Sequence, residues 1–356
     1  MSLRDKILKN TTVDLTDTLI QSKLFKMKDT IPTPVPIINV GLSGTVRGGV
    51  VPGTTMLAGP SKHFKSGFAL LLAASFLRKY PDGVILFYDS EFGSPQSYFE
   101  SFGIDPAKVV HTPVTSLEDL RHDIVNQLQG IERGEHVMIL IDSIGNLASK
   151  KETEDAIEGK SAADFTRAKT IKSLFRLITP HLTLKNIPLV AINHTYMTME
   201  MYSKPVVSGG TGSYYGADNI WIVGRQQDKD ADGLNGYNFV INIEKSRYVK
   251  EKSKFVVNVS FDNGINRWSN LFDIALEHGF IVSEKRGWFN VVDSETGELI
   301  EPAKRRGDLE FNSTFWEGML QNEKFVKKIE DLYRLDGIIL GDDDARTPES
   351  ADAVED

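Results

Sequence analysis

The sequence contains no cysteine. This absence excludes disulfide bridges and thiolate zinc sites, and it is compatible with a reducing compartment. The seven histidines show no H-E-x-x-H or similar spacing, so we expect no dedicated transition-metal site. The segment 1–6 has no signal-peptide core, and no apolar run approaches the length of a membrane-spanning helix. We therefore expect a soluble protein without membrane contacts.

An excess of positive charge is missing as well. The formal net charge is −8. The segment 342–356 holds seven acidic residues and one arginine, or −6, so only −2 is left for the rest of the chain. We expect the tail, 341–356, to be disordered. Because local clusters of basic residues decide whether a surface binds nucleic acid, the overall acidity does not exclude such binding.

The length of 356 residues is sufficient for a large hydrophobic core. Residues 1–36 combine apolar positions at helical spacing with a proline-rich linker, which suggests a helical arm that packs on a neighbouring subunit. An ordinary solvated extension is the alternative. Residues 37–270 alternate predicted strands and helices, and residues 271–340 are predicted to form a small α+β domain.

The predicted strands of the central part are short and apolar, and helical patterns separate them. This alternation indicates an α/β fold with a mainly parallel sheet and helices on both faces. Ligands of such sheets bind at the carboxyl ends of the strands. The predicted strands are 54–58, 84–88, 137–141, 189–192, 220–223, 237–243 and 255–261, and the predicted helices are 68–80, 117–132 and 162–179, the last ending before Pro180. In the C-terminal part we predict helices at 271–278 and 313–335 and paired strands at 280–282 and 288–292.

The loop between the first strand and the first helix has the layout of a phosphate-binding loop. Glycine begins it and Lys65-Ser66 ends it, although Phe64 stands where the pattern has its second glycine. Lys65 would reach the β- and γ-phosphates, and the Ser66 hydroxyl would bind Mg²⁺. A polar turn that caps a core helix is the alternative. The residues expected to contact the nucleotide are Gly59, Pro60, Ser61, Lys62, His63, Phe64, Lys65, Ser66 and Gly67.

Polar residues follow three other predicted strands, and we expect them at the same edge of the sheet. Asp142 could hold Mg²⁺ beside Ser66. Glu91 could activate the water that attacks the γ-phosphate, although Asp89 could equally be the important acid. His194 could sense the γ-phosphate, or it could be merely structural.

Two polar segments have the composition of single-stranded nucleic-acid contacts. The segment 195–216 is rich in glycine, aromatic residues and basic residues, and we expect no regular element there. The other segment begins at Lys150 and precedes a helix with several cations. The alternative is that these cations only form a solvated helix face. The candidate DNA contacts are Lys150, Lys151, Arg167, Lys169, Tyr196, Lys204, Gly209, Gly210, Thr211 and Gly212.

A basic cluster follows the strand at 237–243. Lys245 and Arg247 begin it, and three more lysines come within the next seven residues. The cluster could bind nucleic acid, or it could reach the phosphates of a nucleotide held by a neighbouring subunit.

In combination, these motifs resemble those of the RecA-like recombinases, and within them the UvsX-like strand-exchange proteins of T-even-type bacteriophages. The resemblance covers nearly the whole chain except the tail. It depends on the segments 57–66, 87–93, 141–155, 191–196 and 249–255. It implies a RecA-like P-loop ATPase core with an N-terminal helical oligomerisation arm and a small C-terminal domain.

The resemblance also implies roles for single residues. ATP and Mg²⁺ would be bound by Lys65, Ser66 and Asp142, with Glu91 acting on water and Tyr98 against the adenine ring. His194 stands where RecA has a glutamine that couples nucleotide state to DNA binding. Lys245 and Arg247 would reach the ATP of the neighbouring subunit. Phe64 is then a feature of the subfamily, while Pro95 replaces an acidic contact to adenine and leaves strict selectivity for adenine open.

The expected function is a DNA-dependent ATPase that forms filaments on single-stranded DNA and catalyses homologous pairing and strand exchange in recombination, repair and recombination-dependent replication. Expected partners are single- and double-stranded DNA, further copies of the chain, and phage recombination mediator and single-strand-binding proteins, in the cytoplasm of the bacterial host. A hexameric RecA-fold helicase and a non-hydrolysing DNA-binding scaffold are the alternatives. The product, ADP or AMP, and the filament pitch and polarity stay open.

Overall fold

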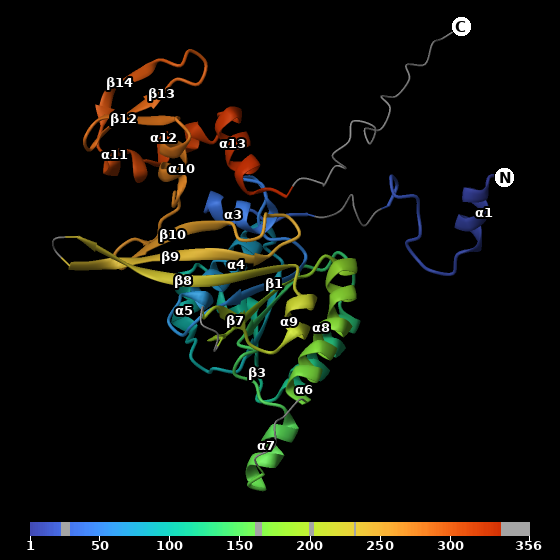
Figure 1. Ribbon diagram of the computed structural model, residues 1–356. Coiled ribbons are helices and arrows are strands. Elements are labelled where there is room, and N and C mark those ends of the chain that lie inside the picture. Colours follow the sequence, from blue (N-terminus) through green and yellow to red (C-terminus); the bar gives the residue numbers. More distant parts are fainter. Residues whose placement is uncertain (23–28, 161–165, 199–202, 231–232, 336–356) are drawn as a thin grey trace.

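The computed structural model describes residues 1–22, 29–160, 166–198, 203–230 and 233–335 (Figure 1). The predicted tail lies outside the described residues, as do parts of the two predicted DNA-binding segments, at 161–163 and 199–202.

A nine-stranded sheet forms the centre of the molecule, with the strand order β11-β10-β9-β8-β1-β5-β4-β2-β3. The strands from β8 to β3 pair in parallel, and β8 to β11 continue the sheet as antiparallel strands. This arrangement confirms the predicted α/β fold class. The strands are β1 (Gly53–Ala58), β2 (Val84–Asp89), β3 (Val109–Pro113), β4 (Val137–Asp142), β5 (Pro188–Asn193), β8 (Asn219–Asp230), β9 (Gly233–Lys245), β10 (Lys254–Ser260) and β11 (Gly264–Ile265).

Helices cover both faces of the sheet, so β1 is buried along its whole length. Leu57 belongs to the core that includes α4 (Lys65–Lys79) and α3 (Pro36–Ser43). Met56 and Ala58 belong to the opposite core, with α6 (Leu117–Gly130) and α8 (Thr166–Lys185). Successive side chains of a strand point to opposite faces, and both faces of this strand therefore require apolar residues.

The helix α8 does not end before Pro180, as predicted, but continues through it to Lys185. Proline inside a helix removes one backbone hydrogen bond. Here Leu174 and Ile178 before the proline and Leu182 after it are fully buried on one face. Because this burial stabilises both halves of the helix, it outweighs the lost hydrogen bond.

The segment 195–216 was predicted to contain no regular element, and this prediction is wrong. The strand β6 (Thr195–Met197) pairs with β7 (Pro205–Val207), and the short helix α9 (Thr211–Gly216) follows. α9 packs closely on α8: a Cβ atom at Gly212 would lie 2.7 Å from the Lys172 backbone, and one at Gly216 would lie 2.4 Å from Phe175. Clustered glycines are typical of an irregular loop, but these two make a close helix contact possible. The sequence reading also missed α3, α5 (Gln96–Ser101), the 3-10 turn η1 (Pro106–Lys108) and β3, and it did not specify α7 (Lys150–Ile157).

The C-terminal unit contains the antiparallel strands β12 (Ile281–Lys285), β13 (Trp288–Val292) and β14 (Leu299–Lys304), with α10 (Leu271–Glu277) and α11 (Arg306–Glu310) beside them. The predicted single helix at 313–335 is wrong, because two helices are present, α12 (Ser313–Met319) and α13 (Glu323–Tyr333). The side chain of Asn322 accepts the backbone N–H groups of residues 324 and 325 and so starts the second helix. Trp316 is fully buried between the two.

The N-terminal helix α1 (Leu3–Asn10) extends away from the rest of the molecule (Figure 1). Its apolar residues Leu3 and Ile7 are 74% and 59% exposed. Within the described part of the chain, no helix has both the length and the apolar character that crossing a membrane requires.

Candidate active site

The phosphate-loop residues connect β1 to α4, and Lys65 is the first residue of that helix. The Lys65 side chain folds back over the loop, and its ammonium donates a hydrogen bond to the Pro60 carbonyl at 2.8 Å. Burial lowers the pKa of Lys65, while the nearby carboxylates of Glu91 and Asp142 raise it. Because Lys65 begins α4, its ammonium lies near a helix N-terminus, where an anion is favoured.

Phe64 is part of the structure of the loop. Its backbone has a left-handed conformation, with φ of 56°, at the N-cap of α4. Its ring stacks on Phe239 at 5.4 Å between ring centroids and contacts Phe68 edge-on at 5.3 Å. The ring also occupies the space beside Gly67, where a Cβ atom would lie 2.5 Å from it. Phe64 thus attaches the loop to strand β9, and Gly67 makes room for it.

Ser66, in the first turn of α4, meets Asp142 at the carboxyl end of β4. The Ser66 hydroxyl donates to Asp142 Oδ2 at 2.7 Å. The other oxygen, Oδ1, is buried and has no hydrogen-bond partner. Burial raises the pKa of Asp142 to about 6, although the bond from Ser66 acts against this. A divalent cation between the two side chains would supply the missing partner, so these residues fit the predicted Mg²⁺. Within the described ranges, no group of three or more His, Asp or Glu residues could hold a metal.

Glu91 follows β2 and faces the loop after β5. Its Oε1 atom accepts a hydrogen bond from the Ser143 hydroxyl at 2.7 Å and lies 3.3 Å from His194 Nε2. The alternative acid, Asp89, is only 3% exposed and is used in structural contacts. Its Oδ1 accepts the backbone N–H groups of residues 91 and 92, and its Oδ2 lies 3.2 Å from His111. Of the two acids, Glu91 is the one that lines the cavity beside the phosphate loop.

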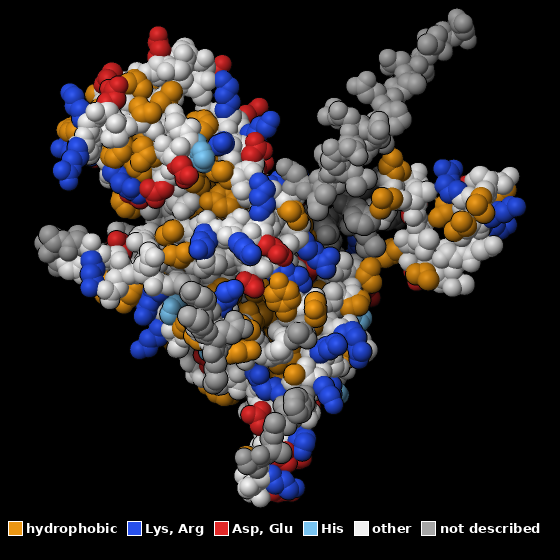
Figure 2. All heavy atoms as spheres, viewed as in Figure 1, with side chains coloured by type: hydrophobic (Ala, Val, Ile, Leu, Met, Phe, Trp, Pro, Cys, Tyr) orange, Lys and Arg blue, Asp and Glu red, His pale blue; other side chains and the backbone are white. Residues whose placement is uncertain are grey.

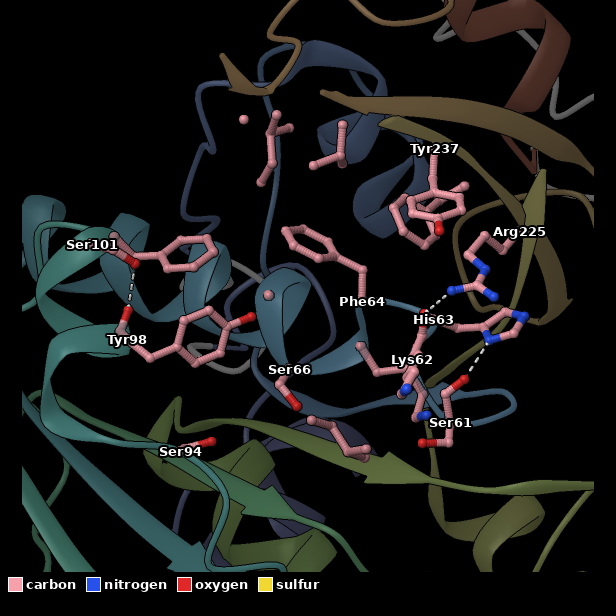
Figure 3. A pocket seen from close by; sticks show the side chains of 18 of the residues that line it. Ser61, Lys62, His63, Phe64, Ser66, Ser94, Tyr98, Ser101, Arg225 and Tyr237 are labelled. Atoms are coloured by element: carbon pink, nitrogen blue, oxygen red, sulfur yellow. Dashed lines mark hydrogen bonds between the residues drawn. The ribbon is translucent and has the colours of Figure 1, made fainter. Parts of the chain in front are cut away.

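A cavity of about 980 Å³ brings most of the predicted nucleotide contacts together. Figure 3 shows Phe64 between Tyr98 and Ser101 on one side and Arg225 and Tyr237 on the other. The predicted residues that line the cavity are Ser61, Lys62, His63, Phe64, Lys65, Ser66, Gly67, Glu91, Tyr98, Asp142 and His194. Gly59 and Pro60 do not line it.

Sequence reasoning missed one wall of this cavity. Arg225 donates to the Lys62 carbonyl at 3.0 Å and stacks on the ring of Tyr237 at 4.5 Å. The residues from Phe261 to Ile265 in the β10–β11 hairpin, apart from Asp262, also contribute. No motif could have identified these residues, because β8, β9 and the hairpin reach the phosphate loop only through the pairing of the sheet.

Lys245 and Arg247 do not line the cavity of their own chain. The Lys245 ammonium donates to the carbonyls of Tyr214 at 2.8 Å and Ala217 at 2.7 Å, at the end of α9. Arg247 pairs with Asp218. Both cations therefore lie beside the segment that follows the predicted DNA loop.

The predicted DNA contacts outside the glycine-rich turn fall into two groups. Lys169, Tyr196 and Lys204 are exposed, and Figure 2 shows Lys and Arg side chains gathered beside α8 and α9. The other cations have partners in the chain. Lys150 pairs with Asp119 at 2.7 Å, Lys151 pairs with Asp155 at 2.8 Å, and Arg167 donates to the carbonyls of residues 144, 145 and 147. Arg167 thus holds the segment after β4 in place.

The glycine-rich turn lies at the start of α9. Gly209 and Gly210 have positive φ angles of 96° and 72°, which favour glycine, and Thr211 begins the helix. Gly212 lies against α8.

Comparison with known proteins identifies the family. The chain is 52% identical over 339 residues to the recombination and repair protein of Enterobacteria phage T4, covering 94% of this chain and 87% of that protein. The chain belongs to the RecA-like recombinases of the UvsX type. Residues 268–329 match the family model described as "Bacteriophage T4, Recombination and repair protein, C-terminal domain".

More distant relatives of this recombinase are bacterial. The RecA protein of Paenarthrobacter aurescens (strain TC1) is 26% identical over 78% of each chain. The RecA protein of Mycobacterium sp. (strain KMS) is 23% identical over 91% of each chain. The resemblance stated from the motifs is confirmed.

Proposed function

We propose that this recombinase is a DNA-dependent ATPase that forms filaments on single-stranded DNA and catalyses homologous pairing and strand exchange in the host cytoplasm. One observation carries the proposal: a single cavity joins the phosphate loop, the Ser66–Asp142 pair and Glu91 at the carboxyl ends of parallel strands. This edge of an α/β sheet is where ligands bind.

The residues of the cavity define how ATP and Mg²⁺ would be held. Lys65 would exchange the Pro60 carbonyl for phosphate oxygens, and Ser66 and Asp142 would hold the cation. Bound Mg²⁺ would offset the negative charge of the phosphates. Tyr98 would lie against the base, and Glu91 would accept a proton from the attacking water.

His194 would connect ATP to DNA. Its ring contacts Glu91, and its backbone leads directly into β6. A change at the γ-phosphate could therefore move the strand pair β6–β7, which carries the exposed Tyr196. The exposed cations of α8 lie on the same side as α9 and would contact the DNA backbone.

The filament would form through two contacts. The exposed apolar residues of α1 would pack on the next subunit, and Lys245 and Arg247 would reach the ATP of a neighbour. Such a head-to-tail contact repeats without closing and so makes a helical filament. Recombination mediator and single-strand-binding proteins of the phage would be further partners.

A D-loop assay tests the proposal. The wild-type protein should pair single-stranded DNA with a homologous duplex when ATP and Mg²⁺ are present, and Lys65→Ala should not. Lys327→Ala removes one exposed charge from α13 and serves as the control. Closed rings without helical filaments in electron micrographs would favour the hexameric helicase. DNA-stimulated phosphate release that is no higher in the wild-type protein than in Lys65→Ala would favour the non-hydrolysing scaffold.

The substitution Phe64→Gly should keep nucleotide binding but change the rate of turnover. Glycine accepts the positive φ of this position, so the loop can keep its path. The lost contacts with Phe68 and Phe239 should lower the free energy of unfolding by about 1–3 kcal/mol, because the ring is half-buried. Titration with a fluorescent ATP analogue, steady-state ATPase rates and urea unfolding measure these effects.

Phe92→Gly is the matched control for stability. Phe92 also has a positive φ, of 53°, but its ring is 60% exposed. We therefore expect little loss of stability there. Complete loss of nucleotide binding in Phe64→Gly would contradict the prediction and show that the loop cannot form without the ring.

A further inference from the structure

Ser143 lies where the Ser66–Asp142 pair and Glu91 meet. It directly follows β4 and Asp142, and it is fully buried. Its hydroxyl donates a hydrogen bond to Glu91 Oε1 at 2.7 Å. His194 Nε2 lies 3.3 Å from the same oxygen and 3.5 Å from Ser143 Oγ. One oxygen of the Glu91 carboxylate thus accepts from Ser143 and lies within reach of the His194 ring.

We infer that Ser143 is a positioning residue for Glu91. The inference rests on the proposed function, in which Glu91 accepts a proton from water. A carboxylate that is free to rotate presents both oxygens in many directions. With Oε1 held by Ser143, the Oε2 atom is left for the water, and in the described part of the chain no hydrogen bond reaches it. The hydroxyl therefore selects the orientation in which Glu91 can act.

The backbone of Ser143 is held in a fixed position. Ser90 Oγ accepts the Ser143 backbone N–H at 3.0 Å and donates to the Ser143 carbonyl at 2.8 Å. The Ser90 backbone N–H donates to the Asp142 carbonyl at 2.9 Å, and its own carbonyl accepts from Asn146 at 2.8 Å. These bonds connect the end of β2 to the end of β4. The backbone that carries the donor to Glu91 is consequently fixed to the ends of both strands.

The two groups beside Glu91 Oε1 then have different roles. His194 begins the segment that leads to β6 and can move with it, whereas Ser143 stays with the sheet. A displacement of His194 would remove one contact of Oε1 and keep the other. Ser143 therefore keeps its hydrogen bond to Glu91 wherever the segment from His194 to β6 moves.

Steady-state ATPase kinetics on single-stranded DNA test this role. Ser143→Ala should lower kcat about 30-fold and leave KM for ATP within about twofold, because a hydrogen bond to a charged group is lost only from the acid that acts on water. Ser143→Cys keeps the shape of the side chain with a larger atom and a weaker donor, so its kcat should fall between those of the alanine variant and the wild type. Affinity for a fluorescent ATP analogue should be the same in all three.

Ser90→Ala is the control for the connection between the strands. It removes the two hydrogen bonds between the Ser90 side chain and the Ser143 backbone but leaves those of the Ser90 backbone and the hydroxyl of Ser143, so kcat should fall about threefold or less. An equal loss in Ser90→Ala and Ser143→Ala would assign the effect to strand packing and overturn the inference. Unchanged kcat in Ser143→Ala, with an active wild type, would overturn the inference alone. A wild type no more active than Lys65→Ala would overturn the proposed function and the inference together.

Discussion

Glu91→Gln should lower DNA-stimulated ATP hydrolysis by about 10²- to 10⁴-fold and still permit ATP binding and filament formation. Glutamine has nearly the same shape, and its carbonyl oxygen can accept the hydrogen bond from Ser143 that Oε1 accepts in the wild type. It cannot accept a proton from water. Phosphate release at saturating ATP and DNA measures the loss, and electron microscopy with ATP should show filaments that persist because hydrolysis no longer disassembles them.

Asp89→Asn is the matched control for this experiment. Its side chain can still accept the backbone N–H groups of residues 91 and 92, as Asp89 Oδ1 does. Hydrolysis should therefore fall much less than in Glu91→Gln. If Asp89→Asn instead abolished hydrolysis and Glu91→Gln retained it, Asp89 would be the acid that acts on water, and the contacts of Glu91 with Ser143 and His194 would have another purpose.

Two inactive variants should regain activity when they are mixed. Lys65→Ala lacks the phosphate-loop lysine, and the double variant Lys245→Ala/Arg247→Ala lacks the cations that we propose reach a neighbour. In a filament assembled at random from equal amounts of both, one kind of interface in four combines an intact phosphate loop with intact cations. The mixture should therefore show about a quarter of the wild-type ATPase rate, although each variant alone shows almost none.

A mixture of Lys65→Ala with Glu91→Gln provides the control, because both substitutions affect the same half of the interface and should give no recovery. Full activity of the double variant alone would contradict the prediction. Lys245 and Arg247 would then only hold the end of α9 and Asp218, which they contact within their own chain.

The side chains that meet around the phosphate loop could be brought together from the sequence because they belong to local patterns. A strand, a loop with Lys65-Ser66 and a helix are consecutive in the chain. Asp142 ends one apolar strand, and Glu91 comes two residues after the end of another. Since parallel strands present their carboxyl ends at one edge, the order of the elements is sufficient to bring these residues together. The fold class followed from the same alternation.

Packing between distant segments decided the features that the sequence reading missed. Pro180 suggested the end of a helix, but buried leucines and isoleucines on both sides keep α8 intact. Glycines suggested an irregular loop, but Gly212 and Gly216 allow α9 to approach α8. In each case the local preference is worth less free energy than the apolar surface that the tertiary contact buries.

The sequence by itself therefore determined the phosphate loop, the acids beside it and the family. Only the tertiary structure decided which atoms contact the loop and the acids. Phe64 is stacked on Phe239, Glu91 accepts from Ser143, and Arg167 binds carbonyls after β4 instead of facing solvent. The physical reason is that hydrogen bonds and ring contacts join residues far apart in the chain. Their partners are set by the register of the sheet, which no local pattern encodes.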